Sequence, residues 1–233
     1  MAATFTKKSR EIDWGDALYL QPLAETYVHS LNVSMVHGAL CVAIEFQESR
    51  LVRHLLKEHD VDLNGTKLRD EFYALHFAVF RANNIPRDPS STEDSQLEII
   101  RLLLAHGADP NSMSCVWEYL PSLQLCKYLA DDQGRCATVV EMLLDAGAEV
   151  DGQSRDGKTA LIEFARLKKA SIVKLLIERG ANVHHTVDPR NVSGALSTVF
   201  NRTSQHPYFR MDDPDFVATF DELILAGAKV DSI

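Results

Sequence analysis

The chain has 233 residues, of which 45% are hydrophobic and 24% charged, and its formal net charge is −9. This hydrophobic content supports a folded core, so a disordered chain is not expected. The negative charge argues against nucleic-acid or anionic-membrane binding through bulk charge, although a local basic patch is compatible with it. There is no apolar run of about 18 residues and no apolar stretch typical of a secretory signal. We therefore expect a cytoplasmic or nuclear protein.

Residues 1–35 have apolar positions at helical spacing, divided by Pro22. They predict an N-terminal helical cap that covers the first face of the helices that follow. The alternative is a short arm that binds a partner.

Residues 36–64 predict a pair of short helices, the first marked by Leu40 and the second by Leu51. The pair ends in His59-Asp60. Because Asp tolerates the left-handed conformation better than most residues, we expect a left-handed turn to close this unit.

Residues 65–111 predict a second pair, with its first helix near 73–78 and its second near 99–104. The segment between them, 82–95, is polar and contains two prolines, which predicts a long inserted loop. A third pair is predicted within 112–151, with a shorter insertion at 130–137.

The clearest pair lies within 152–184. It predicts a helix from Thr159 to about Leu167 and a second one that Gly180 ends. Each helix has one apolar face and is too short to be stable alone. Gly180 stands where a left-handed residue commonly closes a helix.

Residues 185–233 predict a fifth pair with an inserted loop at 201–214, closed by Gly227. The chain reaches Ile233 directly after this pair, without a polar capping unit. We expect either that the sequence belongs to a longer protein or that the fifth pair acts as its own cap.

Four of these pairs close in a matching way, and two of the closing glycines, Gly147 and Gly180, are 33 residues apart. The closings are His-Gly-Ala-Asp (106–109), Ala-Gly-Ala-Glu (146–149), Arg-Gly-Ala-Asn (179–182) and Ala-Gly-Ala-Lys (226–229). Together with the segment from Tyr73 to Ala78, which is similar to the family's Thr-Pro-Leu-His-x-Ala motif, this pattern resembles the ankyrin repeat, whose period is ~33 residues. The resemblance implies an all-α ankyrin-repeat solenoid over residues 36–233, with repeats at about 36–64, 65–111, 112–151, 152–184 and 185–233.

No motif in the sequence indicates catalysis, phosphate binding or a metal site. His76 occupies the family's histidine position, where the resemblance implies a structural role, and His184-His185 is expected to be solvated. The four cysteines lack metal-ligand spacing and are expected to be buried free thiols. We therefore expect a protein that is not an enzyme and has no cofactor and no metal. A weaker alternative is an active site built from the inserted loops and His206.

Ankyrin proteins commonly bind partners through the tips of their fingers, which join successive repeats, and through the exposed side of their inner helices. This sequence places aromatic and charged residues there, of the kind that dominate interface energetics. They are Arg69, Phe72, Phe80, Arg81, Trp117, Glu118, Tyr128, Arg155, Asp156, Lys158, Arg166, Arg190 and Arg202. Trp117 is the strongest hot-spot candidate, whereas packing between repeats is an equal alternative for Phe80 and Tyr128.

The resemblance and the absence of catalytic motifs favour a non-catalytic protein–protein interaction scaffold. Its partner is expected to be another protein, with an acidic or aromatic segment, and neither nucleic acid nor membrane. We expect the scaffold to be a monomer. The alternative is a targeting or regulatory module of a larger enzyme or enzyme complex.

Overall fold

The structure is a computed structural model that describes residues 33–65, 73–82, 95–113, 121–129, 134–187, 194–204 and 213–228. Within these ranges the chain is helical and has no strands, only the isolated bridges Met113–Pro121 and Thr186–Gly194. The helices are α2 (Val33–Glu45), α3 (Ser49–Glu58), α4 (Ala74–Arg81), α5 (Ser95–Ala105), α6 (Ser122–Leu125), the 3-10 helix η4 (Cys126–Tyr128), α7 (Arg135–Asp145), α8 (Ala160–Arg166), α9 (Ala170–Glu178), α10 (Ala195–Ser204) and α11 (Pro214–Leu225). In this part of the chain, no helix combines the length and apolar character that crossing a membrane requires.

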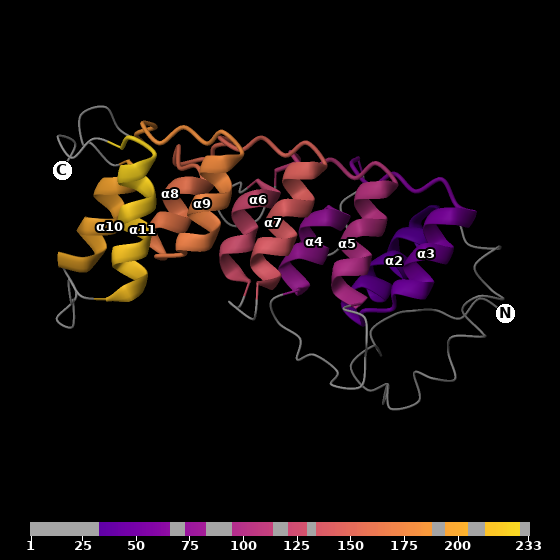
Figure 1. Cartoon of the computed structure of the whole chain (residues 1–233). Helices are drawn as coiled ribbons and strands as arrows, with labels where there is room; N and C mark the ends of the chain where they lie inside the picture. Colours follow the sequence, from indigo (N-terminus) through magenta and orange to yellow (C-terminus); the bar gives the residue numbers. More distant parts are fainter. Residues whose placement is uncertain are drawn as a thin grey trace, which may run out of the picture.

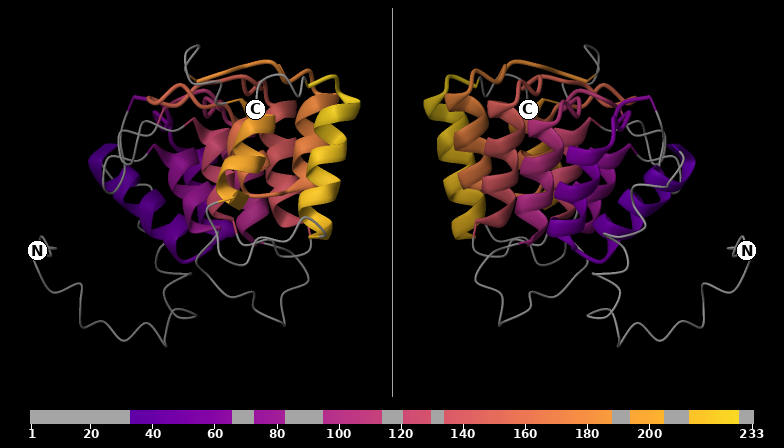
Figure 2. Two further views of the ribbon diagram at one scale, coloured as in Figure 1. Left: turned by 90° about the vertical axis from the view of Figure 1, so that its left-hand side faces the viewer. Right: turned by 90° about the vertical axis from the view of Figure 1, so that its right-hand side faces the viewer.

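The helices form two layers (Figure 1). The inner layer consists of α2, α4, α6, α8 and α10, and the outer layer consists of α3, α5, α7, α9 and α11, with each helix packed on the next one in its own layer. Viewed from its ends, the stack shows successive pairs rotated relative to one another beneath the segments that connect them (Figure 2). This arrangement confirms the expected all-α solenoid.

The four predicted closing glycines have the left-handed conformation, with φ values of 87°, 91°, 90° and 89° at Gly107, Gly147, Gly180 and Gly227. In each case the amide of the following alanine donates a hydrogen bond to the outer helix, as Ala181 does to the carbonyl oxygen of Leu176 at 2.9 Å. This bond satisfies a carbonyl that the helix end leaves unpaired. The closures therefore stop each outer helix at the same point and direct the chain toward the next repeat.

The first pair closes differently from the prediction. His59 follows α3 in an extended conformation, with φ −130° and ψ 141°, so the left-handed turn expected at His59-Asp60 is wrong. The amide of His59 still donates to the carbonyl oxygen of Leu55 at 3.1 Å. An extended exit is available to any L-residue, so this position does not need glycine.

Polar side chains beyond the helix ends connect successive repeats. The Asn64 side chain donates to the carbonyl oxygen of Gly107 at 2.8 Å and accepts from the amide of Asp109 at 2.8 Å. Asn111 makes the same two bonds one repeat later, to Gly147 at 3.0 Å and from Glu149 at 2.7 Å. Each asparagine uses both its donor and its acceptor on the neighbouring repeat, which fixes the register between the two.

Two of the three loops predicted between the helices of a pair are shorter than predicted. α4 ends at Arg81 and α5 begins at Ser95, in agreement with a connection over 82–95. In contrast, α7 begins at Arg135, so the loop predicted at 130–137 is wrong over its last three residues. The loop predicted at 201–214 is also wrong at its start, because α10 continues to Ser204. Residues 1–32, which hold most of the predicted N-terminal cap, lie outside the described residues.

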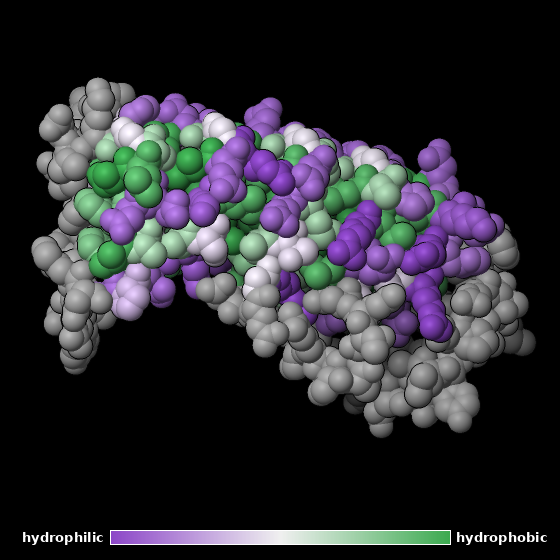
Figure 3. All heavy atoms as spheres, in the orientation of Figure 1, coloured by the Kyte–Doolittle hydropathy of each residue, from purple (hydrophilic) through white to green (hydrophobic). Residues whose placement is uncertain are grey.

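The core runs along the whole stack, between the two layers and between successive repeats, and its largest fully buried residues include Leu40, Leu75, Leu161 and Phe164. Figure 3 shows the outer face, where hydrophobic residues gather over the end that carries α11. Leu225 of α11 is 83% exposed.

Cys126 and Cys136 are buried free thiols, and burial raises the pKa of Cys126 well above its ordinary value. Cys41 is free and half-buried, whereas Cys115 lies outside the described residues. His76 is fully buried, and its ring nitrogens lie 3.4 Å from the hydroxyls of Ser112 and Ser122 in the next repeat. This histidine therefore connects two repeats, as its structural interpretation predicted.

We predict that Gly147→Ala and Gly180→Ala each lower the free energy of unfolding by about 1–2 kcal/mol, because an L-residue is strained at positive φ. A Cβ would meet nothing within 4 Å at either site, so steric contact contributes nothing. Gly38→Ala, in α2 and equally open, is the control and should raise stability by up to ~1 kcal/mol. Urea denaturation measures all three, and equal effects at the three positions would contradict the argument.

Asp213 supports a second prediction. Its carboxylate caps α11 by accepting from the amide of Asp215 at 3.1 Å, and it accepts from Lys168 Nζ at 2.6 Å. The hydrogen bond from Lys168 is the main reason why the pKa of Asp213 lies below its ordinary value. A carboxyl whose pKa is lowered in the folded state stabilises the fold at pH values above its ordinary pKa. This stabilisation is lost as the pH falls through the folded-state pKa.

We therefore predict that wild type is more stable than Asp213→Asn at pH 7, and that the difference shrinks and is lost as the pH falls below the ordinary Asp range through the folded-state pKa. Urea titrations of both proteins across this pH range measure it. Asp221→Asn, at an exposed position on the same helix, is the control. A difference that persists unchanged in acid would show that the charge of Asp213 is not what stabilises α11.

Candidate partner-binding site

The structure places seven of the thirteen predicted binding residues. Arg155 and Asp156 are exposed in the finger before α8, and Phe80, Arg81, Tyr128, Lys158 and Arg166 are half-buried. Arg202 lies on α10, but its side chain is not described. The remaining five lie outside the described residues: Arg69, Phe72, Trp117, Glu118 and Arg190.

Three of the seven come together at the junction of the third and fourth repeats. Tyr128, Lys158 and Arg166 line one pocket of about 420 Å³. Phe80 and Arg81 are not among its lining residues; Arg81 instead reaches back to the carbonyl oxygen of Glu45 in the first repeat at 3.5 Å. The rest of the lining was not predicted from the sequence: Lys127, Glu163 and Leu167.

The finger that carries Arg155 and Asp156 is held by a tight turn. The amide of Ser154 donates to the carbonyl oxygen of Lys158 at 2.9 Å, and Gly157 has a φ of 77°. From the third repeat, the Gln124 side chain donates to the same Lys158 carbonyl at 2.7 Å. The backbone beneath the Lys158 side chain is therefore fixed by two repeats.

Asp156 stands beside Lys158 at the edge of the pocket. Partial burial acts to raise the pKa of Asp156, but hydrogen bonds from Lys158 and Ser154 outweigh it and lower the pKa below its ordinary value. The Ser154 hydroxyl donates to Asp156 at 2.5 Å. Asp156 is therefore ionised at neutral pH and partly neutralises Lys158.

Glu163 forms the floor of the pocket and is surrounded by cations. Its side chain is only 4% exposed, and its Oε2 accepts from Nη2 and Nε of Arg166 at 2.8 and 3.2 Å. Lys127 Nζ lies 3.6 Å from Oε2, and Lys158 Nζ lies 3.8 Å from Oε1. One buried carboxylate thus faces three positive charges.

The charged pair Lys127 and Glu163 departs from the pattern within this chain. Glu163 lies two residues after the leucine that opens its inner helix, and Lys127 lies four residues after the equivalent leucine of its own repeat. In the other four repeats, each of these two positions holds an uncharged residue. Those residues are Val42, Phe77, Leu125 and Thr198 for Glu163, and Ile44, Val79, Ala165 and Phe200 for Lys127. Buried charges are costly to desolvate and often stabilise less than apolar residues of similar size. The departure therefore reflects something other than packing.

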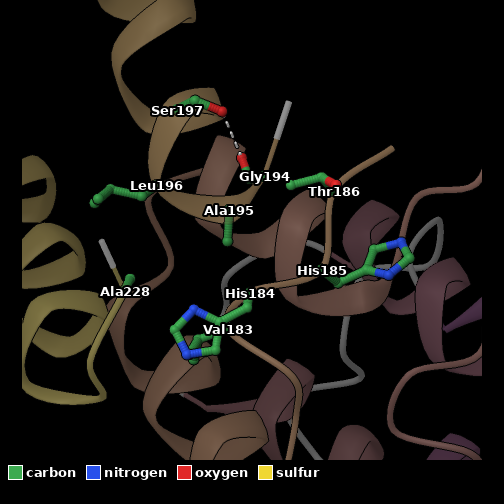
Figure 4. Close-up of a pocket in the computed structure, with 9 residues that line it drawn as sticks. All are labelled: Val183, His184, His185, Thr186, Gly194, Ala195, Leu196, Ser197 and Ala228. Carbon is green, nitrogen blue, oxygen red and sulfur yellow. Dashed lines mark hydrogen bonds between the residues drawn. The ribbon is translucent and has the colours of Figure 1, made fainter. Parts of the chain in front are cut away.

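A second pocket, of about 340 Å³, lies beside the segment that follows α9 and the start of α10 (Figure 4). It is lined in part by His184 and His185, whose rings point in different directions in Figure 4. His185 Nε2 is 2.9 Å from the carbonyl oxygen of Gly157, and His185 is half-buried, so only His184 of the expected solvated pair is exposed. Within the described ranges, no group of three or more His, Cys, Asp or Glu residues could hold a metal ion.

Three comparisons relate the chain to known proteins. The family model for the ankyrin repeat matches residues 70–114 and 156–188. The human ankyrin repeat and SOCS box protein 6 is 30% identical over 176 residues, which covers 72% of this chain. Among solved structures, an ankyrin repeat domain from Acinetobacter baumannii superposes with a TM-score of 0.64 and 21% identity, covering 83% of both chains. The ankyrin repeat domain of Bcl-3, of the IkappaB protein family, gives a TM-score of 0.61 at 21% identity and covers 83% of this chain and 73% of that one.

The match covers much more of this chain than of the human relative. The match spans only 37% of that protein. The two solved structures, at 21% identity, show the fold alone.

We predict that Glu163→Leu lowers the free energy of unfolding by about 3 kcal/mol, because it leaves the Lys127 ammonium buried without its counter-ion. Adding Lys127→Val, the residue at the same position of the second repeat, should restore wild-type stability or exceed it by ~1 kcal/mol. Urea denaturation of the single and double variants measures this. A double variant that stays as unstable as the single one would mean that the ion pair is a net stabiliser.

Proposed function

The chain is an ankyrin-repeat protein, and we propose from this premise that it binds a segment of another protein without catalysing a reaction. The segment would lie across the fingers and the exposed side of the inner helices, where the fourth finger and the pocket at Glu163 are located. The observation that carries the proposal is this pocket, because it gathers three cations around one buried carboxylate at the junction of two repeats.

The properties of this surface favour a partner segment that combines acidic and aromatic or apolar residues. Lys127, Lys158 and Arg166 supply positive charge in a chain whose net charge is −9. Tyr128 supplies a rigid aromatic surface beside them. Aromatic and arginine residues with complementary charge are the usual anchors of protein interfaces. Trp117 in the third finger remains our candidate for the strongest single contact.

A second function, as the recognition module of a larger enzyme or enzyme complex, is favoured by one observation. The chain spans 37% of a relative whose name includes a SOCS box as well as ankyrin repeats. In that case the same inner surface would select the protein on which the larger assembly acts.

We further propose that the protein works as a monomer in the cytoplasm or nucleus. The free thiols at Cys41, Cys126 and Cys136 support a reducing compartment.

The test compares partners captured from cells by wild type, Trp117→Ala and Arg155→Glu, with the affinity of the identified partner then measured on purified proteins. We predict that each variant weakens binding about tenfold or more, because interface energy concentrates in a few aromatic and arginine residues. Lys174→Glu, exposed on the outer helix α9, is the control. It replaces a positive charge by a negative one, as Arg155→Glu does, and should bind normally.

Thermal denaturation of the same variants separates binding from folding, and the midpoints should agree with wild type within a few degrees. Unchanged affinity in both inner-surface variants, with a loss in Lys174→Glu, would place the partner on the outer helices instead.

A further inference from the structure

The pocket between the third and fourth repeats has more positive than negative charge. Lys127, Lys158 and Arg166 line it, and Glu163 is the one carboxylate among its lining residues. Asp156, at the edge, pairs with Lys158. Counting all five groups, three cations against two carboxylates leave a net charge of +1.

Lys127 is the group that the fold satisfies least. Its side chain is only 8% exposed, and its ammonium lies 3.6 Å from Glu163 Oε2, beyond hydrogen-bond distance. Its other described interaction is with the face of Tyr128, whose ring centre is 5.1 Å from Nζ. Among the residues that the structure describes, no acceptor forms a hydrogen bond with this ammonium. An ammonium has three donors, so Lys127 retains donors for a ligand that enters the pocket.

Arg166, in contrast, is held in place. Two of its nitrogens donate to one oxygen of Glu163, which orients the guanidinium within the pocket. Glu163 therefore acts as a positioning residue: it keeps three cations together that would otherwise repel one another. A carboxylate that arrives from outside would meet a site that is already assembled.

We infer that this pocket binds a single Asp or Glu side chain of the partner segment, with its carboxylate accepting hydrogen bonds from Lys127 and its neighbours. The inference rests on the proposed function, since it assumes that a protein segment lies on this surface. Charge-assisted hydrogen bonds to a carboxylate are among the strongest available to lysine and arginine.

The shape of the pocket fits a side chain attached to a peptide. Its volume of about 420 Å³ lies within the range of roughly 300–1,000 Å³ that is usual for ligand pockets. Tyr128 and Leu167 form apolar parts of its wall, against which the methylene groups of a glutamate or an adjacent apolar residue can pack. The single net positive charge matches one carboxylate better than a polyanion.

The first experiment titrates the ¹⁵N-labelled full chain with N-acetyl-glutamate N-methylamide, which carries one carboxylate, and follows the backbone resonances by NMR. We expect shifts centred on residues 127, 128, 158 and 163–167, with an affinity at least about tenfold stronger than that of N-acetyl-glutamine N-methylamide at equal ionic strength. The exposed cations Arg53 and Arg101 of the outer helices are internal controls. Equal shifts near them, or equal effects of the two compounds, would overturn the inference.

Inorganic phosphate forms the second arm. Phosphate and free glutamate are compared as competitors of N-acetyl-glutamate N-methylamide. If phosphate displaces this compound at a lower concentration than free glutamate does, the pocket takes a phosphate group, and the carboxylate assignment is overturned.

The variant Lys127→Val tests the site on a folded protein, because Glu163 keeps its hydrogen bonds from Arg166 and the pocket loses its net positive charge. Binding of the glutamate compound should fall about tenfold or more in this variant and stay unchanged in Lys174→Ala. Persistent binding in Lys127→Val would overturn the role given to Lys127.

The two proposals fail in different ways. If the captured partner requires Trp117 and Arg155 but binds equally well after each of its Asp and Glu residues is replaced by Asn or Gln, the carboxylate pocket is overturned and the scaffold function stands. If the partner requires neither Trp117 nor Arg155, the scaffold surface itself is wrong.

Discussion

The structure depends on the contact between one repeat and the next, because each helix pair is too short to be stable alone. Two features fix this contact at the fingers. A left-handed glycine ends the outer helix, as Gly147 and Gly180 do, and directs the chain toward the following pair. Asn64 and Asn111 then bond to the backbone just beyond the closing glycine of the next repeat. Helix ends and fingers therefore recur at equivalent places, although the connections between the helices differ in length.

This construction explains how the chain tolerates charges at its centre. In a linear stack, the cost of an unfavourable group is confined mainly to its own repeat and the two neighbours. The fourth repeat is well supported, since Thr159 caps α8 and Leu161 and Phe164 are almost fully buried. It can therefore hold Glu163 against Lys127 where the other repeats use uncharged residues.

Much of the fold could be predicted because its signals are local. The closing glycines and the apolar faces of α8 and α9 lie within a few residues of one another in the sequence. The ends of the inserted segments were harder to predict. α10 extends through Asn201 to Ser204 because no proline or glycine interrupts it there, and α7 begins at Arg135, directly after the left-handed Gly134. Composition alone does not show which polar residues continue a helix that is packed on a neighbour.

The candidate site could be predicted only in part, for a different physical reason. Tyr128, Lys158 and Arg166 were found from their positions on the exposed surface of each repeat, taken one repeat at a time. Lys127 and Glu163 were missed because their importance lies in a pairing across two repeats, 36 residues apart in the sequence. The available signal was a charge at a position that is uncharged in the other repeats. Because burying a charge has a cost that apolar packing avoids, this departure from the other repeats is the signal on which the proposed ligand pocket rests.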